Sequence, residues 1–142
     1  MVSTKIDNEA SAKAAERLRA AGLRPTRQRT LLAGLLFRSG DRHVSAEALH
    51  EEALKAGFKV SLATVYNTLH QFTEAGLLQQ VVVDASRSYF DTNLGEHQHF
   101  YCPDEEALID IPEGAISVSG LPDAPKGTRV ERVDVIIRLK RS

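Results

Sequence analysis

The sequence predicts an α+β protein in which a helical N-terminal part precedes a smaller part built mainly of strands. Four stretches before residue 77 combine helical spacing of apolar residues with residues that start or stop helices. Residues 77–91 then contain two β-prone runs around the turn sequence Asp84-Ala85-Ser86, and short strand patterns follow beyond Asn93. With 142 residues to share, we expect one domain over residues 1–93 and a small second domain over residues 94–142.

Each expected helix has a recognisable beginning, end or both. Residues 10–21 are rich in Ala, Arg and Glu, which favour helix, and Gly22 ends the stretch. The next three helices have a hydroxyl side chain that can cap the free N–H groups of the first turn: Thr26, Ser45 and Ser61. These helices are expected to end at Arg38 (before Gly40), at Gly57 and at Gly76.

Two strands complete the first domain. Residues 77–83 are β-prone, the turn at 84–86 reverses the chain, and residues 88–91 return as a second strand. The order of helices followed by a hairpin is typical of a winged helix-turn-helix, a fold that places one helix in the major groove of DNA.

The second domain is expected to be a small α/β unit. Short strands are predicted at residues 97–102 and 107–111, a weak helix near Ala115, and a long alternating strand over residues 130–139. A domain of about fifty residues is marginal alone, and its long last strand leaves an unpaired edge. A second copy of the chain could cover that edge, so we expect a homodimer built through residues 95–142.

Several classes of protein are excluded. Cys102 is the only cysteine, so the chain can form neither an internal disulfide nor a four-cysteine site for structural zinc. The longest apolar stretch, around residues 31–37, is too short to span a membrane, and residues 1–9 lack the apolar core of a secretion signal. We expect a cytoplasmic protein without a membrane partner. Phosphate-loop and hydrolase motifs are absent, so we expect no enzyme; a nucleophile pair of Cys102 and His99 is the enzymatic alternative.

Charge is divided along the chain, although the formal net charge is only −1. Residues 1–87 hold 12 Lys and Arg against 9 Asp and Glu, whereas residues 88–142 hold 6 against 10. A basic first part suits contact with phosphates, and an acidic second part with histidines suits cations. Two solvated faces of unlike sign are the alternative.

The fourth expected helix has the pattern of a DNA-reading helix. Four apolar residues recur at steps of three and four and are expected to form one buried stripe: Leu62, Val65, Leu69 and Phe72. The opposite side has no acid before Glu74, and its methyl groups, amides and aromatic rings can contact base edges. The residues expected at this surface are Thr64, Asn67 and Gln71, flanked by Ala63, Tyr66 and His70. A surface helix that merely lacks acids is the alternative.

Three arginines bracket the start of the second expected helix: Arg24, Arg27 and Arg29. Clustered guanidinium groups suit contact with DNA phosphates or with the minor groove. Three solvated side chains are the alternative. The hairpin and the acid-free helix favour DNA binding for the set as a whole.

A set of histidines and aspartates suits a metal ion. His97 and His99 are two residues apart, so both imidazoles point to one face of a strand. Asp110 is expected on a facing strand, Asp91 lies six residues before His97, and His43 lies just before the third helix. Such a mixed nitrogen and oxygen site suits Fe(II), Mn(II) or Zn(II). An ordinary pair of surface histidines is the alternative.

Cys102 is expected on the strand face opposite to His99, so it is not expected to share the metal site. With Pro103 it forms a Cys-Pro pair, which can present a thiolate to haem iron. A buried, inert thiol is the alternative.

Several segments resemble the ferric uptake regulator family: LRAAGLRPTRQR (18–29), RHVSAEALHEEA (42–53), VSLATVYNTLHQFTEAGLL (60–78), and SYFDTN (88–93) followed by H-x-H. The resemblance implies a winged-helix domain joined to a dimerisation domain with a metal between them. It implies a regulator of transcription that binds double-stranded DNA as a homodimer, at an A/T-rich palindromic operator. The implied metal ligands are His43, Asp91, His97, His99 and Asp110.

A departure from the family pattern makes the sequence resemble one branch of the family in particular. The family's structural zinc uses two C-x-x-C pairs, of which only Cys102 remains, so that zinc is not expected here. This loss, together with the phrases LRPTRQR, SLATVYNTL and YFDTN, is most similar to the iron response regulator branch. That branch implies control of iron and haem genes by haem, manganese or iron; haem would use the region of His97 and His99 with Cys102. A peroxide sensor with bound Fe(II) and a metal-independent DNA-binding module are the alternatives.

Overall fold

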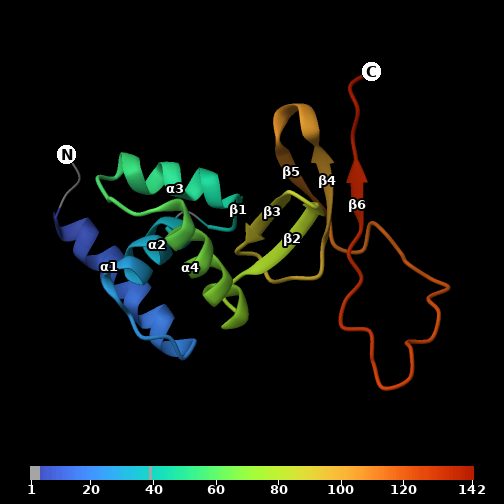
Figure 1. The fold of residues 1–142 in the computed structure, drawn as a ribbon, viewed down its shortest axis with the longest axis horizontal. Coiled ribbons are helices and arrows are strands. Elements are labelled where there is room, and N and C mark those ends of the chain that lie inside the picture. The colour runs from blue at the N-terminus through green and yellow to red at the C-terminus, as the bar shows by residue number, and fades with distance from the viewer. Residues whose placement is uncertain (1–3, 39) are drawn as a thin grey trace. The chain divides into compact units, whose positions relative to one another are not determined.

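The computed structural model describes residues 4–38 and 40–142, with side chains from Glu9 onward. The chain divides into two compact units, the first ending at Leu94 and the second beginning at Gly95 (Figure 1). Residues 1–3, which belong to the segment 1–9 that lacks the apolar core of a secretion signal, lie outside the described residues. No helix in the described part of the chain is both long and apolar enough to cross a membrane.

The first unit contains the four expected helices. They are α1 (Thr4–Ala20), α2 (Arg27–Phe37), α3 (Ala46–Lys55) and α4 (Leu62–Glu74). The caps are as predicted: the side chains of Thr26, Ser45 and Ser61 each accept a hydrogen bond from the backbone N–H three residues later. Helix α1 begins six residues earlier than expected, because no Gly or Pro interrupts residues 4–9.

The core of the first unit lies between these helices. Val65, Leu69 and Phe72 of α4 are fully buried, as the stripe predicted. Leu62 is 36% exposed, which contradicts its place in that stripe: it is the first residue of the helix and lies beyond the edge of the core. Thr68 fills the remaining buried position, where its hydroxyl donates to the carbonyl of Thr64 one turn earlier.

A small antiparallel sheet completes the first unit in the order β1-β3-β2. Strands β2 (Gln79–Asp84) and β3 (Arg87–Asp91) form the expected hairpin, and the Asp84 carboxylate accepts the Ser86 N–H at its turn. The two-residue strand β1 (His43–Val44) was not predicted, because two residues are too few to show an alternating pattern. The helices of this unit, the short strand β1 and the hairpin make the winged helix-turn-helix that the sequence predicted.

The second unit is a three-stranded sheet in the order β5-β4-β6. Strand β4 (Gln98–Cys102) is central; β5 (Ala107–Ile111) pairs with it antiparallel, and β6 (Ile136–Arg138) pairs with it parallel. A short 3-10 helix, Pro103–Glu105, leads from β4 towards β5.

Two expectations for the second unit are wrong. The weak helix near Ala115 is absent: Ala115 N–H donates to the carbonyl of Pro112 in a turn that contains Gly114 at φ +83°. The long strand over residues 130–139 is reduced to β6. A strand needs a neighbour for its backbone hydrogen bonds, and β4 offers its free edge only to residues 135–139. Residues 112–135 contain no helix or strand.

Candidate metal centre and nucleic-acid interface

Three predicted metal ligands meet on one face of the sheet in the second unit. His99 of β4 lies directly opposite Asp110 of β5, and His97 immediately precedes β4. The Nε2 atoms of His97 and His99 lie 3.2 Å and 3.3 Å from the same oxygen, Oδ1 of Asp110. The two imidazole rings are 4.5 Å apart between centroids. The predicted convergence of these side chains is therefore present within a single unit.

The backbone sets the protonation of one of these rings. His97 Nδ1 lies 2.9 Å from the carbonyl oxygen of Gly95, which can only accept a hydrogen bond. Nδ1 therefore carries a proton, and in the neutral imidazole Nε2 carries the lone pair. That lone pair faces a carboxylate oxygen, so the contact requires either a proton or a metal ion between the two atoms.

The spacing of the donor atoms fits a metal ion. Ligand atoms at the usual metal–nitrogen or metal–oxygen distance of about 2.0–2.2 Å are about 3.0–3.5 Å apart in tetrahedral or octahedral sites. The separations of 3.2 Å and 3.3 Å lie within that range. Two imidazoles and one carboxylate suit divalent Fe, Mn or Zn better than a soft monovalent ion.

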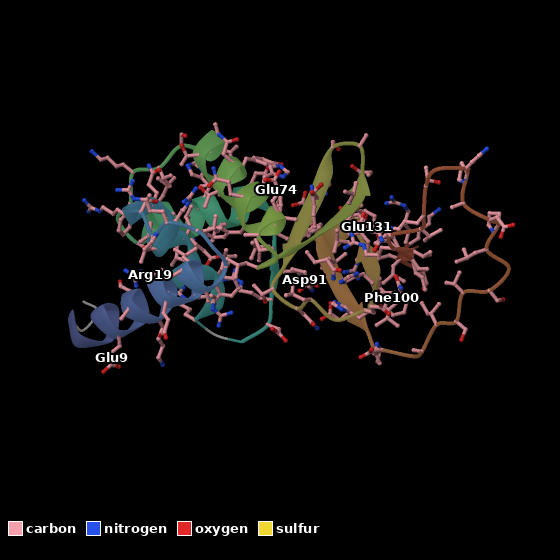
Figure 2. All side chains as sticks on the ribbon, turned by 90° about the horizontal axis from the view of Figure 1, so that it is seen from below. Glu9, Arg19, Glu74, Asp91, Phe100 and Glu131 are labelled. Carbon is pink, nitrogen blue, oxygen red and sulfur yellow. The ribbon has the colours of Figure 1, made fainter. Side chains whose placement is uncertain are left out.

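The other two predicted ligands lie together in the first unit. His43 of β1 is the register partner of Asp91 of β3, and residues directly opposite each other project to the same face of a sheet. Asp91, labelled in Figure 2, ends β3, and its Oδ1 accepts the N–H of Asn93. The His43 ring contacts Tyr89 edge to face with centroids 6.4 Å apart. The first unit therefore contains two of the five predicted ligands, and the second unit contains the other three.

Cys102 has a different environment. It is 8% exposed and pairs with Ala107 across the strands. Strand alternation places His99 and Tyr101 on one face of β4 and Cys102 on the other, as predicted.

Helix α4 carries the residues that are predicted to contact nucleic acid. Ala63, Asn67 and Gln71 are exposed, at intervals of four residues that align them along one side of the helix. Thr64 and Tyr66 are half-buried; the Thr64 hydroxyl accepts from Ser61, and the Tyr66 ring stacks on His70 with centroids 6.0 Å apart.

The three predicted DNA-binding arginines differ in their contacts. Arg24 is exposed, and Arg27 lies over the ring of Phe58 at 5.6 Å from its centroid. Arg29 instead joins α2 to α4: its Nε and Nη2 both donate to Oε1 of Gln71, and its Nη1 donates to the carbonyl of Arg24. Sequence reasoning missed this cross-helix contact, since 42 residues separate Arg29 from Gln71.

A second ionic contact that sequence reasoning missed lies beside His43. The Arg42 guanidinium donates to both carboxylate oxygens of Glu52 in α3 and to the carbonyl of Leu35 in α2. The backbone of Arg42 also exchanges hydrogen bonds with Thr92, next to Asp91. Arg42 therefore fixes the segment that carries His43 to two helices and to the end of β3.

Comparisons with known proteins agree on one family. A model of the ferric uptake regulator family matches residues 20–135. The ferric uptake regulation protein of Pseudomonas aeruginosa is 36% identical over 100 residues, which cover 70% of this chain and 75% of that protein. Its counterpart from Escherichia coli K12 is 33% identical over 100 residues, covering 70% and 68%.

Solved structures give the same result. The ferric uptake regulator of Pseudomonas aeruginosa with manganese matches with a TM-score of 0.65 and 26% identity, covering 90% of this chain and 97% of that one. The Vibrio cholerae ferric uptake regulator matches in fold with a TM-score of 0.68 at 22% identity, covering 89% and 98%. The chain therefore belongs to the ferric uptake regulator family, whose members are metal-responsive regulators of transcription and not enzymes.

Proposed function

We propose that this chain regulates iron and haem genes by binding double-stranded DNA as a homodimer in response to a divalent metal ion or haem. The observation that carries the proposal is the convergence of His97 and His99 on one oxygen of Asp110. His97, the first of these residues in the chain, lies three residues after Leu94, where the winged-helix unit ends.

The metal is proposed to draw ligands from both units. Six chain steps separate Asp91 from His97, a span of at most about 21 Å when fully extended. Asp91 and its strand partner His43 can therefore contribute to a site built on His97, His99 and Asp110. An ion shared in this way would restrict how the two units move, and so favour dimers whose recognition helices match the spacing of two half-sites. When bound, Fe(II), Mn(II) or Zn(II) would supply the positive charge that these donor atoms require.

The opposite face of the second sheet favours the homodimer. Phe100 of β4 is flanked by Ile109 of β5 and Ile137 of β6 in one row across the strands. Ile109 is 46% exposed and Ile137 is 37% exposed. A row of exposed apolar side chains suits contact with a second copy, and strand alternation places it on the face away from His99. Substitution of Ile137 by Glu is expected to convert a dimer to a monomer in sedimentation analysis.

Haem is the effector implied by the iron response regulator branch. In that case His97 and His99 would hold the haem iron, and Cys102 would join them only if β4 rearranged, because alternation places it on the other face. A peroxide sensor is the second candidate, since it uses the same His and Asp set with Fe(II). Exposure of the iron-loaded protein to peroxide, followed by mass spectrometry, would then show added oxygen on His43 or His97.

The test is fluorescence anisotropy of a labelled A/T-rich palindromic duplex at fixed salt, with metal-free protein, with Mn(II) and with haemin. Tighter binding with Mn(II), abolished in the double variant His97→Ala and His99→Ala, is expected for a metal-activated regulator. Loss of binding with haemin alone identifies the haem-responsive branch. Asp110→Asn removes a proposed ligand oxygen and should weaken the Mn(II) response, whereas Asp104→Asn, an exposed acid of the same unit, should not.

An unchanged response to both effectors in the double histidine variant would refute this mechanism. Elemental analysis of protein purified without a tag separates the remaining alternative, since a metal-independent DNA-binding module would retain no stoichiometric metal.

A further inference from the structure

A polar contact between two helices fixes one side chain of the proposed DNA-reading surface. Arg29 of α2 donates to Oε1 of Gln71 in α4 from both Nε and Nη2, at 3.2 Å and 3.1 Å. Its third nitrogen, Nη1, donates to the carbonyl oxygen of Arg24 at 3.0 Å. The guanidinium is thus held on two sides, and it holds the Gln71 amide in turn.

This contact fixes the polarity of the Gln71 amide. A guanidinium has five N–H donors and no acceptor, so only the oxygen of the amide can face it. The amide NH2 group is directed away from Arg29, and it donates to no other residue in the part of the chain that the structure describes. Gln71 therefore offers hydrogen-bond donors and no available acceptor lone pair of good geometry.

The position of Gln71 places these donors on the proposed interface. Gln71 is exposed and lies one helical turn beyond Asn67, which itself lies one turn beyond Ala63. The three residues share one side of α4, the side that carries no acid before Glu74. If α4 enters the major groove, a donor-only side chain faces the base edges about one turn along from Asn67.

We propose that Gln71 determines specificity by reading a keto base, guanine or thymine, and that Arg29 is its positioning residue; this inference rests on the proposed function of α4. Guanine O6 and thymine O4 are the keto acceptors of the major groove. A free glutamine prefers adenine, because its oxygen accepts from N6 while its NH2 donates to N7. The contact with Arg29 occupies that oxygen and so removes the adenine preference. Cytosine is rejected because its N4 amino group is itself a donor.

The test is selection from a pool of duplexes with a randomised core, in the presence of Mn(II) and without haemin, followed by sequencing of the bound fraction. Wild-type protein is expected to favour guanine or thymine in one position of each half-site. Arg29→Lys keeps the charge but not the two-donor fork, so it frees the Gln71 oxygen. The preference in that position should then shift towards adenine by about tenfold in relative affinity, with the dependence of affinity on salt unchanged.

Two further variants make the result specific. Gln71→Glu retains an acceptor for Arg29, so the helices stay joined, but the new side chain has no hydrogen-bond donor. It should convert the preference to cytosine, because a carboxylate can accept a hydrogen bond from the cytosine amino group. Arg17→Lys is the matched control: Arg17 lies over the ring of Phe37, 4.3 Å from its centroid, and has no hydrogen bond to Gln71, so the base preference should not change. Thermal unfolding of each variant shows whether the fold is retained.

Three outcomes would overturn the inference. In the first, Arg29→Lys and Gln71→Glu leave every base preference as in the wild type. In the second, substitutions of Gln71 weaken binding to all sequences equally, which indicates contact with phosphate instead of a base. In the third, the wild-type protein selects no sequence from the pool. The third outcome also refutes the proposed function, whereas the first two do not contradict it.

Discussion

The helical unit and the strand unit differ in how much of each is removed from water. In the first unit, apolar side chains from all four helices and two strands form one buried cluster, in which Leu18, Leu32 and Phe90 are completely inaccessible. In the second unit, the buried residues are confined to the paired strands and include a histidine, His99. The first unit therefore has a core sufficient to hold its helices, whereas the second buries fewer side chains and is small for a domain.

The largest expected effect is the loss of a core side chain from the helical unit. Phe72 of α4 is fully buried, so Phe72→Ala removes its contacts and leaves a cavity. We expect the free energy of unfolding to fall by about 3–5 kcal/mol, measured by urea denaturation followed by circular dichroism. Phe72→Leu should cost clearly less because it keeps most of the volume. Equal costs for the two variants would show that the core of this unit is not closely packed.

Metal binding should stabilise the strand unit in particular. An ion that binds only the folded protein, at a hundred times its dissociation constant, contributes about 2.7 kcal/mol. Mn(II) is therefore expected to raise the midpoint of thermal unfolding, and hydrogen exchange should slow most in β4 and β5, which carry His99 and Asp110. The double variant His97→Ala and His99→Ala should lose this effect. Equal protection of α1, far from the ligands in sequence, would contradict a local site.

The same difference between the units decides what the sequence could predict. Hydroxyl caps and terminal glycines mark the helices locally, so Ser61 and Gly76 locate α4 without knowledge of the rest of the fold. Residues 130–135 alternate as a strand does, yet they form none because pairing with β4 limits β6 to Ile136–Arg138. Local pattern predicts an element only where its partners are also present.

The candidate sites follow the same rule. The H-x-H pair and Asp110 were predictable because strand alternation and register place them on one face. The contacts of Arg29 with Gln71 and of Arg42 with Glu52 were not predictable. The first joins α2 to α4 and the second joins the segment before β1 to α3, and the relative positions of these elements depend on the packed core. In a sequence, basic residues near the start of a helix indicate contact with phosphates. Only the fold shows which of these side chains already forms hydrogen bonds within the protein.

The ion pair of Arg42 tests whether the segment before α3 is held by the helical unit. Both side chains are about one quarter exposed, and the guanidinium contacts both oxygens of Glu52. Arg42→Met should lower the free energy of unfolding by about 2 kcal/mol, since it removes hydrogen bonds to a charged group. It should also weaken Mn(II) binding through the neighbouring His43, measured by titration calorimetry. Glu51→Gln is the control: Glu51 and its partner Lys55 are exposed, so stability should hardly change.

The smallest expected effect concerns a single cap of the helical unit. Ser45 precedes α3, and its hydroxyl accepts the N–H of Ala48 at 3.1 Å. Ser45→Ala leaves that N–H without its side-chain partner and should lower the free energy of unfolding by about 1 kcal/mol, whereas Ser45→Asp should retain most of the stability. Urea denaturation of the three proteins measures this difference. Because Ser45 follows His43 and Val44 directly, an unchanged Mn(II) affinity in Ser45→Ala would show that β1 is held by its pairing with β3 and not by the helix that follows it.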